Sequence, residues 1–326
     1  MKVCVIGIGN IGKHHVRIYS EIPEIEFTAI SDINETTGSV LAKKFRIKFY
    51  RDFEEMLATE LPDFVSICVP TSLHYKIAKI CIKKKINVLI EKPITEKIDD
   101  AKELIRLSKK YNVKLFVGHV ERFNPAVKKV KEMINKNDLG KITAIIARRV
   151  GGFPPQIKDA DVTIDLAIHD IDVINYLLEQ TPKSVYYNKQ KNHIKNREDS
   201  VEIFLKYQNT SAYIQANWIT PVKIRKLTIT GTEGYLELDY ITQKIEFYKS
   251  NYKKFKEASK NFSDYIMIFS DPDKINISVA KKEPLKEELL HYINCVKNNI
   301  DMDPTFAVDA LKIATSSSNY DKNKKN

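Results

Sequence analysis

The sequence predicts an α/β protein in two parts: a doubly wound parallel sheet first, then an α+β part built on a mixed or antiparallel sheet. Through about residue 120, short apolar runs alternate with longer segments of helical period, as in βαβ units. A glycine-rich turn follows the first apolar run directly. Beyond about residue 140 the apolar runs come at the spacing of hairpins. These three observations predict the fold class.

The first part contains six strand-like runs separated by helical segments. The runs fall at 3–6, 26–31, 48–50, 64–68, 87–90 and 114–117, and the clearest helical segments at 13–20, 37–45, 75–84 and 98–111. Six strands with intervening helices fit a doubly wound domain.

In the second part we expect a helix over 125–136, beginning at Pro125, a strand over 141–150 and one long helix over 163–178. Further strands are predicted at 184–188, 201–207, 212–218, 226–230, 235–239 and 244–248, and final helices at 286–297 and 306–317. The expected domains are therefore 1–121 and 122–326, with a C-terminal helix that can pack back on the first domain.

Length and composition bound the class of protein. A chain of 326 residues with 43% hydrophobic residues can form two globular domains. No window approaches the ~18–20 apolar residues of a membrane span, and the chain opens on a strand-like run, so we expect a cytoplasmic protein without a membrane partner. The four cysteines show no metal-binding spacing, which predicts no metal site. Cys4 and Cys68 lie in apolar runs and are expected to be buried.

The net charge of +11 has three interpretations: a lysine-rich solvated surface, an anionic small ligand, or nucleic acid. The lysines are scattered and lack the interleaved aromatic residues of a single-strand binder. We therefore expect no nucleic-acid partner, while the first two interpretations stay open.

Gly7-Ile8-Gly9-Asn10-Ile11-Gly12 is a G-x-G-x-x-G sequence between the first strand and the first helix. In that position the glycines allow a tight turn, close approach of a pyrophosphate and tight helix–strand packing. Asp32 lies 20 residues after Gly12, where a carboxylate accepts hydrogen bonds from the adenine ribose. The sequence thus predicts a dinucleotide-binding Rossmann domain with NAD as cofactor. The nearby Lys43 and Lys44 keep NADP open, and glycines that merely turn a surface loop are the alternative.

Two polar segments follow the fourth and fifth strands, at the edge where an open α/β sheet binds ligands. The first is Pro70-Thr71-Ser72-Leu73-His74 and the second is Glu91-Lys92-Pro93. A lysine in this position is partly desolvated and close to a cationic nicotinamide, which suits a general base or acid. The alternative is a surface lysine that pairs with Glu91.

Asp165 and His169 are four residues apart on the predicted helix 163–178 and share a face, with Asp172 one turn beyond. Such a group can orient a histidine for proton transfer, or it can be a solvated helix face. For His14, His15, His193 and His291 we predict surface or packing roles.

Together these motifs resemble the glucose-fructose oxidoreductase, inositol dehydrogenase and MocA family of NAD(P)-dependent oxidoreductases. The segments that carry the resemblance are 7–12, 70–74, 91–93, 118–125 and 165–172. The resemblance implies an open-faced C-terminal sheet used in oligomerisation, a Lys92–Pro93 bond that is often cis, and catalysis by Lys92 with Asp165 and His169. It also implies cofactor contacts from Pro70, Thr71, His74, Glu91, Lys92 and Arg122, and substrate contacts from Phe123, Asn124, Asp165 and His169.

Within the family, the segments 121–127, 148–155 and 217–226 resemble the UDP-N-acetylglucosamine 3-dehydrogenase branch. A nucleotide sugar carries two phosphates, for which Arg148, Arg149, Lys223 and Arg225 can supply donors. The alternative for each of the four is a surface residue of an exposed strand or loop.

The resemblance implies oxidation of a sugar hydroxyl to a ketone, at C3 of UDP-N-acetylglucosamine, by a homodimer or homotetramer. The alternatives are an inositol, polyol or other sugar dehydrogenase, and a non-catalytic dinucleotide-binding regulator. The presence of Lys92, Asp165 and His169 together favours an enzyme.

Overall fold

The structure, a computed structural model, describes residues 1–153, 160–250, 273–316 and 320–321. The chain divides into two compact units. The first contains residues 1–120 and 283–312, and the second residues 121–282 and 313–326. The expected boundary after residue 121 lies beside the observed division after residue 120, and a C-terminal segment returns to the first unit.

The first unit is built on a parallel six-stranded sheet in the order β3-β2-β1-β4-β5-β6. Its strands are β1 (Lys2–Ile6), β2 (Glu26–Ser31), β3 (Lys48–Tyr50), β4 (Phe64–Ile67), β5 (Asn87–Glu91) and β6 (Leu115–Gly118). The strand order reverses between β1 and β4, which is the switch point where doubly wound sheets bind ligands. The predicted Rossmann topology is confirmed.

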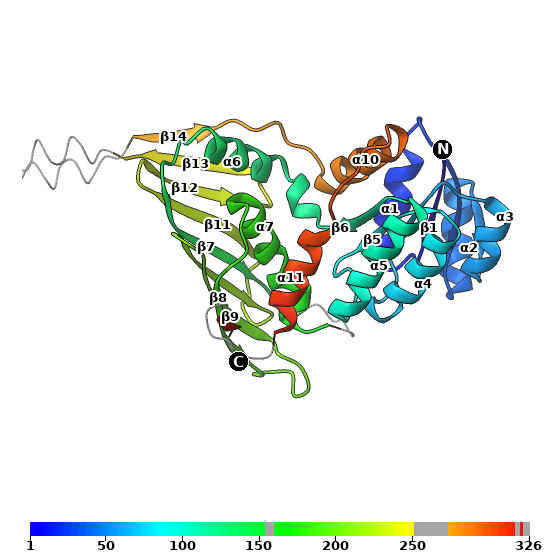
Figure 1. Ribbon diagram of the computed structural model, residues 1–326, viewed down its shortest axis with the longest axis horizontal. Coiled ribbons are helices and arrows are strands. Elements are labelled where there is room, and N and C mark those ends of the chain that lie inside the picture. Colours follow the sequence, from blue (N-terminus) through cyan, green and yellow to red (C-terminus); the bar gives the residue numbers. More distant parts are fainter. Residues whose placement is uncertain (154–159, 251–272, 317–319, 322–326) are drawn as a thin grey trace, which may run out of the picture. The chain divides into compact units, whose positions relative to one another are not determined.

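Helices connect these strands (Figure 1). They are α1 (Gly12–Ser20), α2 (Glu35–Phe45), α3 (Phe53–Glu60), α4 (Thr71–Lys83) and α5 (Ile98–Tyr111), and α10 (Pro284–Lys297) joins this unit from the far end of the chain. α3 is not among the expected helices, although Asp52 caps it by accepting the backbone N–H of Glu54 at 2.8 Å.

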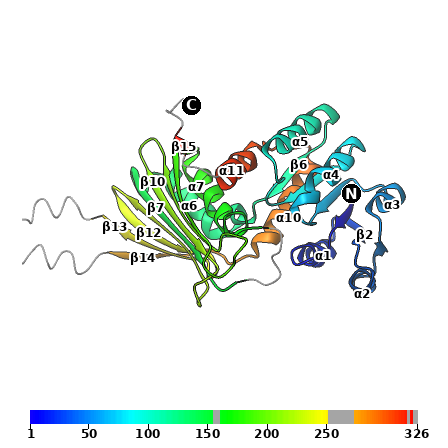
Figure 2. The same ribbon diagram turned by 90° about the horizontal axis from the view of Figure 1, so that it is seen from below.

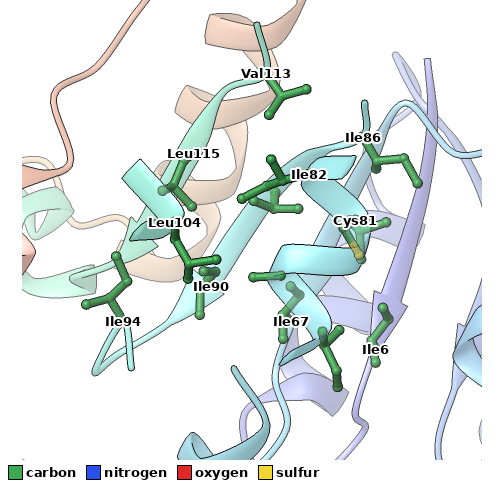
Figure 3. Close-up of a cluster of buried hydrophobic side chains, with 14 of the residues drawn as sticks. Ile6, Ile67, Cys81, Ile82, Ile86, Ile90, Ile94, Leu104, Val113 and Leu115 are labelled. Carbon is green, nitrogen blue, oxygen red and sulfur yellow. The ribbon is translucent and has the colours of Figure 1, made fainter. Parts of the chain in front are cut away.

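A hydrophobic core lies between the sheet and helices α4 and α5 (Figure 3). Ile6, Ile67, Ile90 and Leu115 come from four neighbouring strands and pack with Ile82 of α4 and Leu104 of α5. All four cysteines are buried and free, so the expected burial of Cys4 and Cys68 is confirmed.

The second unit is built on a nine-stranded mixed sheet in the order β14-β13-β12-β11-β7-β10-β9-β8-β15. The strands are β7 (Ile142–Val150), β8 (Ser184–Gln190), β9 (Ser200–Lys206), β10 (Ser211–Asn217), β11 (Ile224–Gly231), β12 (Gly234–Asp239), β13 (Lys244–Lys249), β14 (Lys274–Ile277) and β15 (Tyr320–Asp321). β7 and β10 are parallel, and the other neighbouring pairs are antiparallel.

Helices α6 (Pro125–Asn135) and α7 (Ile168–Leu178) lie along one face of this sheet (Figure 2). In the part of the chain that the structure describes, no helix covers the opposite face. The remaining described helices are the 3₁₀ turn η1 (Val120–Phe123), the π-helix η2 (Thr163–Ala167) and α11 (Thr305–Thr315).

The segment 163–178 differs from the single α-helix that we expected. It opens as the π-helix η2 and continues as α7. π-helical turns are rare, widen the helix locally and occur often at functional sites. Asp165 lies in η2, and His169 lies in the first turn of α7.

No described helix is long and apolar enough to cross a membrane. Among the described residues there is also no cluster of three or more histidine, cysteine, aspartate or glutamate side chains that could hold a metal ion.

Candidate active site

The glycine-rich loop lies at the carboxyl end of β1. Gly7 has a φ of +86°, and a Cβ atom there would lie 2.7 Å from the carbonyl of Cys68. A Cβ on Gly12 would lie 2.0 Å from the Gly7 carbonyl oxygen. At Gly9 a Cβ would meet nothing within 4 Å, so the loop borders open space there. Gly7 thus allows the tight turn, Gly12 allows the helix to pack closely, and Gly9 leaves room for a ligand to approach the backbone. These are the features that bind a dinucleotide pyrophosphate.

Helix α1 starts at this loop and offers an anion site. No side chain caps its N-terminus, and its first turn contains no acidic residue. Its first backbone N–H groups and its dipole therefore favour a negatively charged group.

Asp32 follows β2 and is held by two backbone groups. Its Oδ2 accepts the N–H of Ile8 at 2.8 Å, and its Oδ1 accepts the N–H of Asn34 at 2.8 Å. The neighbouring Ile33 side chain is 86% exposed. A fixed carboxylate can accept hydrogen bonds from the free hydroxyls of an adenine ribose. The next residue, Ile33, is apolar and offers no positive charge for a 2′-phosphate.

Lys92 follows β5 at the carboxyl edge of the sheet and is partly buried. Its bond to Pro93 is cis, as the family resemblance implied. The preceding Glu91 is buried, and its Oε1 lies 2.9 Å from Nε2 of His15 on α1. Burial works against ionisation of Glu91, yet the hydrogen bond from His15 and the charges of His15 and Lys92 hold its pKa below the ordinary value. His15, for which a surface or packing role was expected, thus contacts the residue before Lys92.

His74 is buried in the first turns of α4. Its Nδ1 lies 2.8 Å from the carbonyl oxygen of Pro93, and its Nε2 lies 2.9 Å from that of Val69. We therefore assign His74 to backbone contacts in place of the expected cofactor contact. Pro70 is exposed and Thr71 partly exposed at the start of the same helix, where both can meet a ligand.

In the second unit, Asp165 and His169 are both partly exposed. The indole N–H of Trp218 donates to Oδ2 of Asp165 at 3.3 Å. The Phe153 ring, 42% exposed, packs edge-on against Trp218 with 5.6 Å between ring centroids. The aromatic pair of Phe153 and Trp218 therefore lies next to Asp165, and Trp218 orients its carboxylate.

The other two carboxylates of this helix are structural. Asp172 is 1% exposed and accepts two hydrogen bonds of 2.7 Å from Arg122, and Asp170 is 1% exposed and accepts two from Arg149. The solvated-face alternative is therefore wrong for Asp172. Arg122, expected at the cofactor, is bonded in a fork to Asp172.

Asn124 and Phe123 also have structural roles in place of the expected substrate contacts. Asn124 is 1% exposed, accepts the backbone N–H of Ala126 at the start of α6 and donates to the carbonyl of Tyr240. The Phe123 ring is 6% exposed, and the Lys128 ammonium lies 5.0 Å from its centroid.

The structure corrects the grouping of Arg148 with Arg149. Consecutive residues of a strand point to opposite faces. Arg149 reaches Asp170 on the helix-covered face, and its Nη1 donates to Glu121 at 2.9 Å. Although burial opposes the charge, these carboxylates raise the pKa of Arg149 well above its ordinary value. Arg148 is exposed and points to the opposite face, so the two arginines cannot hold one diphosphate.

Of the two remaining candidate cations, Arg225 lies on the helix-covered face of the sheet. Arg225 pairs with Arg149 in the register of β11 and β7, and it is only partly exposed. Its Nη1 donates to the carbonyl of Val150 at 2.6 Å, while burial and the charge of Arg149 lower its pKa. Lys223 is exposed just before β11. Pro154 and Pro155, which contributed to the branch resemblance, lie outside the described residues.

Comparison with known protein families identifies both parts of the chain. Residues 1–119 match the model of the oxidoreductase family with an NAD-binding Rossmann fold, and residues 127–237 match the GFO/IDH/MocA C-terminal domain. The chain therefore belongs to the GFO/IDH/MocA family of oxidoreductases. Its cofactor is NAD, in agreement with the glycine loop and Asp32.

Among curated relatives, UDP-N-acetylglucosamine 3-dehydrogenase of Acidithiobacillus ferrooxidans is 26% identical over 249 residues, which cover 76% of this chain and 77% of the relative. Myo-inositol 2-dehydrogenase of Thermotoga maritima is 29% identical over 191 residues, which cover 57% of each. The chain thus spans just over half the length of the second relative.

Solved structures share the fold across the chain. The Acidithiobacillus enzyme has a TM-score of 0.83 at 24% identity, with 96% of this chain and 95% of the other covered. Scyllo-inositol dehydrogenase from Lactobacillus casei, solved with NAD(H) and scyllo-inositol, has a TM-score of 0.77 at 17% identity, with 96% and 94% covered.

Proposed function

We propose that this protein is an NAD-dependent dehydrogenase that oxidises the C3 hydroxyl of UDP-N-acetylglucosamine to a ketone. The observation that carries the proposal is the position of Lys92, partly buried directly after β5 at the ligand-binding edge of an NAD-binding sheet. A sensor that only binds the dinucleotide has no need of an amine there.

The reaction removes two hydrogens from the carbinol carbon and its oxygen. NAD, when bound, accepts the carbon-bound hydrogen with its electron pair. The Lys92 amine takes the hydroxyl proton, so that the oxygen forms its double bond to carbon. His169 donates a hydrogen bond to the same oxygen or relays the proton, and Asp165, itself held by Trp218, orients that imidazole.

We assign the cofactor contacts to Gly7, Ile8, Gly9, Asn10, Ile11 and Gly12 at the pyrophosphate, to Asp32 at the adenine ribose, and to Pro70 and Thr71 at the start of α4. The open space at Gly9 and the uncapped start of α1 support the first assignment. The bonds from Ile8 and Asn34 to the Asp32 carboxylate support the second.

For the substrate we assign the diphosphate to Arg225 and Lys223, and the apolar part of the nucleotide sugar to Phe153. Arg225 has guanidinium N–H groups beyond the Nη1 that bonds the backbone, and forked donors suit phosphate oxygens. The exposed Phe153 ring next to Trp218 offers a flat apolar surface. The relative that acts on UDP-N-acetylglucosamine supports this choice.

The experiment is a substrate panel. Purified protein is incubated with NAD and either UDP-N-acetylglucosamine, other UDP-sugars, myo-inositol, scyllo-inositol or glucose, and reduced nicotinamide is followed by absorbance. We expect turnover with UDP-N-acetylglucosamine to exceed that with every free polyol. Turnover of an inositol that matched the best UDP-sugar would move the protein to the inositol dehydrogenases, which the second relative represents. No turnover of any compound, with NAD bound, would favour a regulator.

We further propose that the uncovered face of the nine-stranded sheet joins two copies of this chain in a homodimer or homotetramer. Tyr186, Phe204, Tyr213 and Ile146 stand opposite one another on four neighbouring strands, and each is 36–50% exposed. A contiguous apolar row on an uncovered sheet is an association surface.

A further inference from the structure

Two buried histidines hold the residues on either side of Lys92. His15 bonds the side chain of Glu91, and His74 bonds the carbonyl of Pro93. The two rings come from different helices, His15 from α1 and His74 from α4. Neither ring is exposed by more than 1%. Lys92 is therefore anchored at both neighbours, while its own side chain remains partly exposed.

The Glu91 contact is closely fitted. Its Oε1 lies 2.9 Å from His15 Nε2, and its Oε2 lies 3.3 Å from the backbone nitrogen of Lys92. A Cβ on Gly118 of β6 would lie 2.9 Å from Oε1, so the glycine makes room for the carboxylate. Displacing His15 would leave this buried charge without its imidazole partner, and the carboxylate would move together with the backbone that it contacts.

The His74 contact joins two loops. Its ring bridges the carbonyl of Val69, after β4, and the carbonyl of Pro93, after β5. A neutral imidazole carries one N–H, which donates to one of these two carbonyls, while the ring also packs against the other. The ring therefore lies between the two loops at the point where the chain leaves Lys92.

We propose that His15 and His74 are positioning residues that fix Glu91 and Pro93, and thereby aim the Lys92 amine at the substrate hydroxyl. The proposal rests on the proposed role of Lys92 as base. A lysine has a long flexible side chain, so the direction of its Cα–Cβ bond decides where the amine can reach. Misplacement of a reacting group by about 1 Å can cost about 10²-fold in rate.

The test is a double-mutant cycle on the rate of NADH formation with UDP-N-acetylglucosamine, or with the best compound of the panel. The variants are His15→Phe, His74→Phe and Lys92→Ala, then each histidine change combined with Lys92→Ala. We expect each histidine change alone to slow the reaction about ten- to hundredfold. In the Lys92→Ala background the same changes should cost nothing further, because residues that act as one unit are not additive.

A merely structural role gives a different result: each double variant would then fall below Lys92→Ala by the full factor of the single histidine change, and the proposal would be overturned. Wild-type rates in both histidine variants, with Lys92→Ala impaired, would also overturn it while leaving the proposed function in place. Failure of the proposed function shows separately, as an unimpaired Lys92→Ala.

Two controls guard against misfolding and against an indirect effect on NAD. His15→Gln keeps a donor for Glu91 and should recover most of the rate lost in His15→Phe. His14→Phe changes the exposed neighbour and should leave the rate unchanged. Calorimetry on all variants should give dissociation constants for NAD close to wild type, and a loss of NAD binding that matched the loss of rate would contradict the positioning role.

The state of the His74 ring can be measured without substrate or cofactor. In ¹⁵N-labelled protein at neutral pH we expect an imidazole N–H signal from His74, slowed in exchange by burial, which disappears in His74→Phe. Rapid exchange of this N–H with solvent would overturn the contact with the two loops.

Discussion

Asp32 at the end of β2 is hydrogen-bonded to Ile8 within the glycine loop, at 2.8 Å between the carboxylate Oδ2 and the backbone nitrogen. The N–H of Asn34 holds the second oxygen. The loop that we propose for the pyrophosphate therefore also fixes the carboxylate that we propose for the ribose. A carboxylate bonded in this way cannot turn away from a 2′-phosphate, and the two negative charges would repel each other.

We expect the protein to bind NAD more tightly than NADP. Asp32→Asn keeps an acceptor for Ile8 but removes the charge, and Asp32→Ala removes both. Loss of one charge-assisted bond to the ribose costs about 1.5–3 kcal/mol, or about ten- to hundredfold in NAD affinity. Both variants should shift preference toward NADP. Calorimetry with the two cofactors measures this, and equal or tighter binding of NADP to the unmodified protein would contradict it.

Lys92→Ala should lower turnover by about 10²–10⁴-fold, the usual contribution of a general base, and leave the dissociation constant for NAD nearly unchanged. Steady-state kinetics and calorimetry measure the two quantities. Lys97→Ala, which removes an exposed lysine five positions further along, is the matched control and should match wild type. If the Lys92 variant kept full turnover, the base would have to be sought elsewhere.

Arg225→Ala should raise the Michaelis constant for UDP-N-acetylglucosamine by about ten- to hundredfold, with little effect on that for NAD, because it removes one charge-assisted contact to phosphate. Arg148→Ala removes the same charge from the other face of the sheet and should leave both constants unchanged. The reverse ranking of the two variants would refute our assignment of the phosphate donors.

The uncovered sheet face should hold the oligomer together. Phe204→Lys places a charge in the middle of the apolar row, between Tyr186 and Tyr213, and should lower the mass measured by light scattering at micromolar concentration. Ile241→Lys changes an exposed isoleucine, 55% accessible, outside that row and is the control. A monomeric mass for the unmodified protein would rule out this use of the sheet.

Glu91 should make the free energy of unfolding depend on pH in the acidic range. Because its pKa in the folded state lies below the ordinary 4.5, its ionised form contributes stability above that pH, and the contribution is lost as the pH falls through the lower folded value. We expect urea unfolding of wild type and Glu91→Gln to differ most at neutral pH. The difference should shrink progressively below pH 4.5. A difference that grew in acid would show that the carboxyl is protonated in the native state.

The sequence predicted the Rossmann fold and the position of the glycine loop in it, because both depend on local order along the chain. Gly7–Gly12 follow a strand and open a helix, and Asp32 and Lys92 directly follow strands of the same sheet. The alternation of side chains along the predicted strand 141–150 could have separated Arg148 from Arg149. Asp52 followed by Glu54 and Glu55 was a capping signal for the helix that was missed.

What the sequence could not predict are partners far apart in the chain. Arg122 meets Asp172 across 50 positions, and Arg149 meets Asp170 across 21. Spacing on one helix made Asp172 resemble a solvated residue, and only tertiary packing shows that it is the buried partner of an arginine. The same holds for His15 and Glu91, which lie 76 positions apart.

The return of residues 283–312 to the first unit affects how the protein is made. Tyr292 stacks on Phe116 with 4.5 Å between ring centroids and donates to the carbonyl of Val117, and Leu311 belongs to the core beside the sheet. A ribosome releases these residues only after all strands of the second sheet up to β14 have been synthesised. The nucleotide-binding half therefore waits, with part of its core exposed, for nearly the full length of translation, and a nascent chain stalled before residue 283 should not bind NAD.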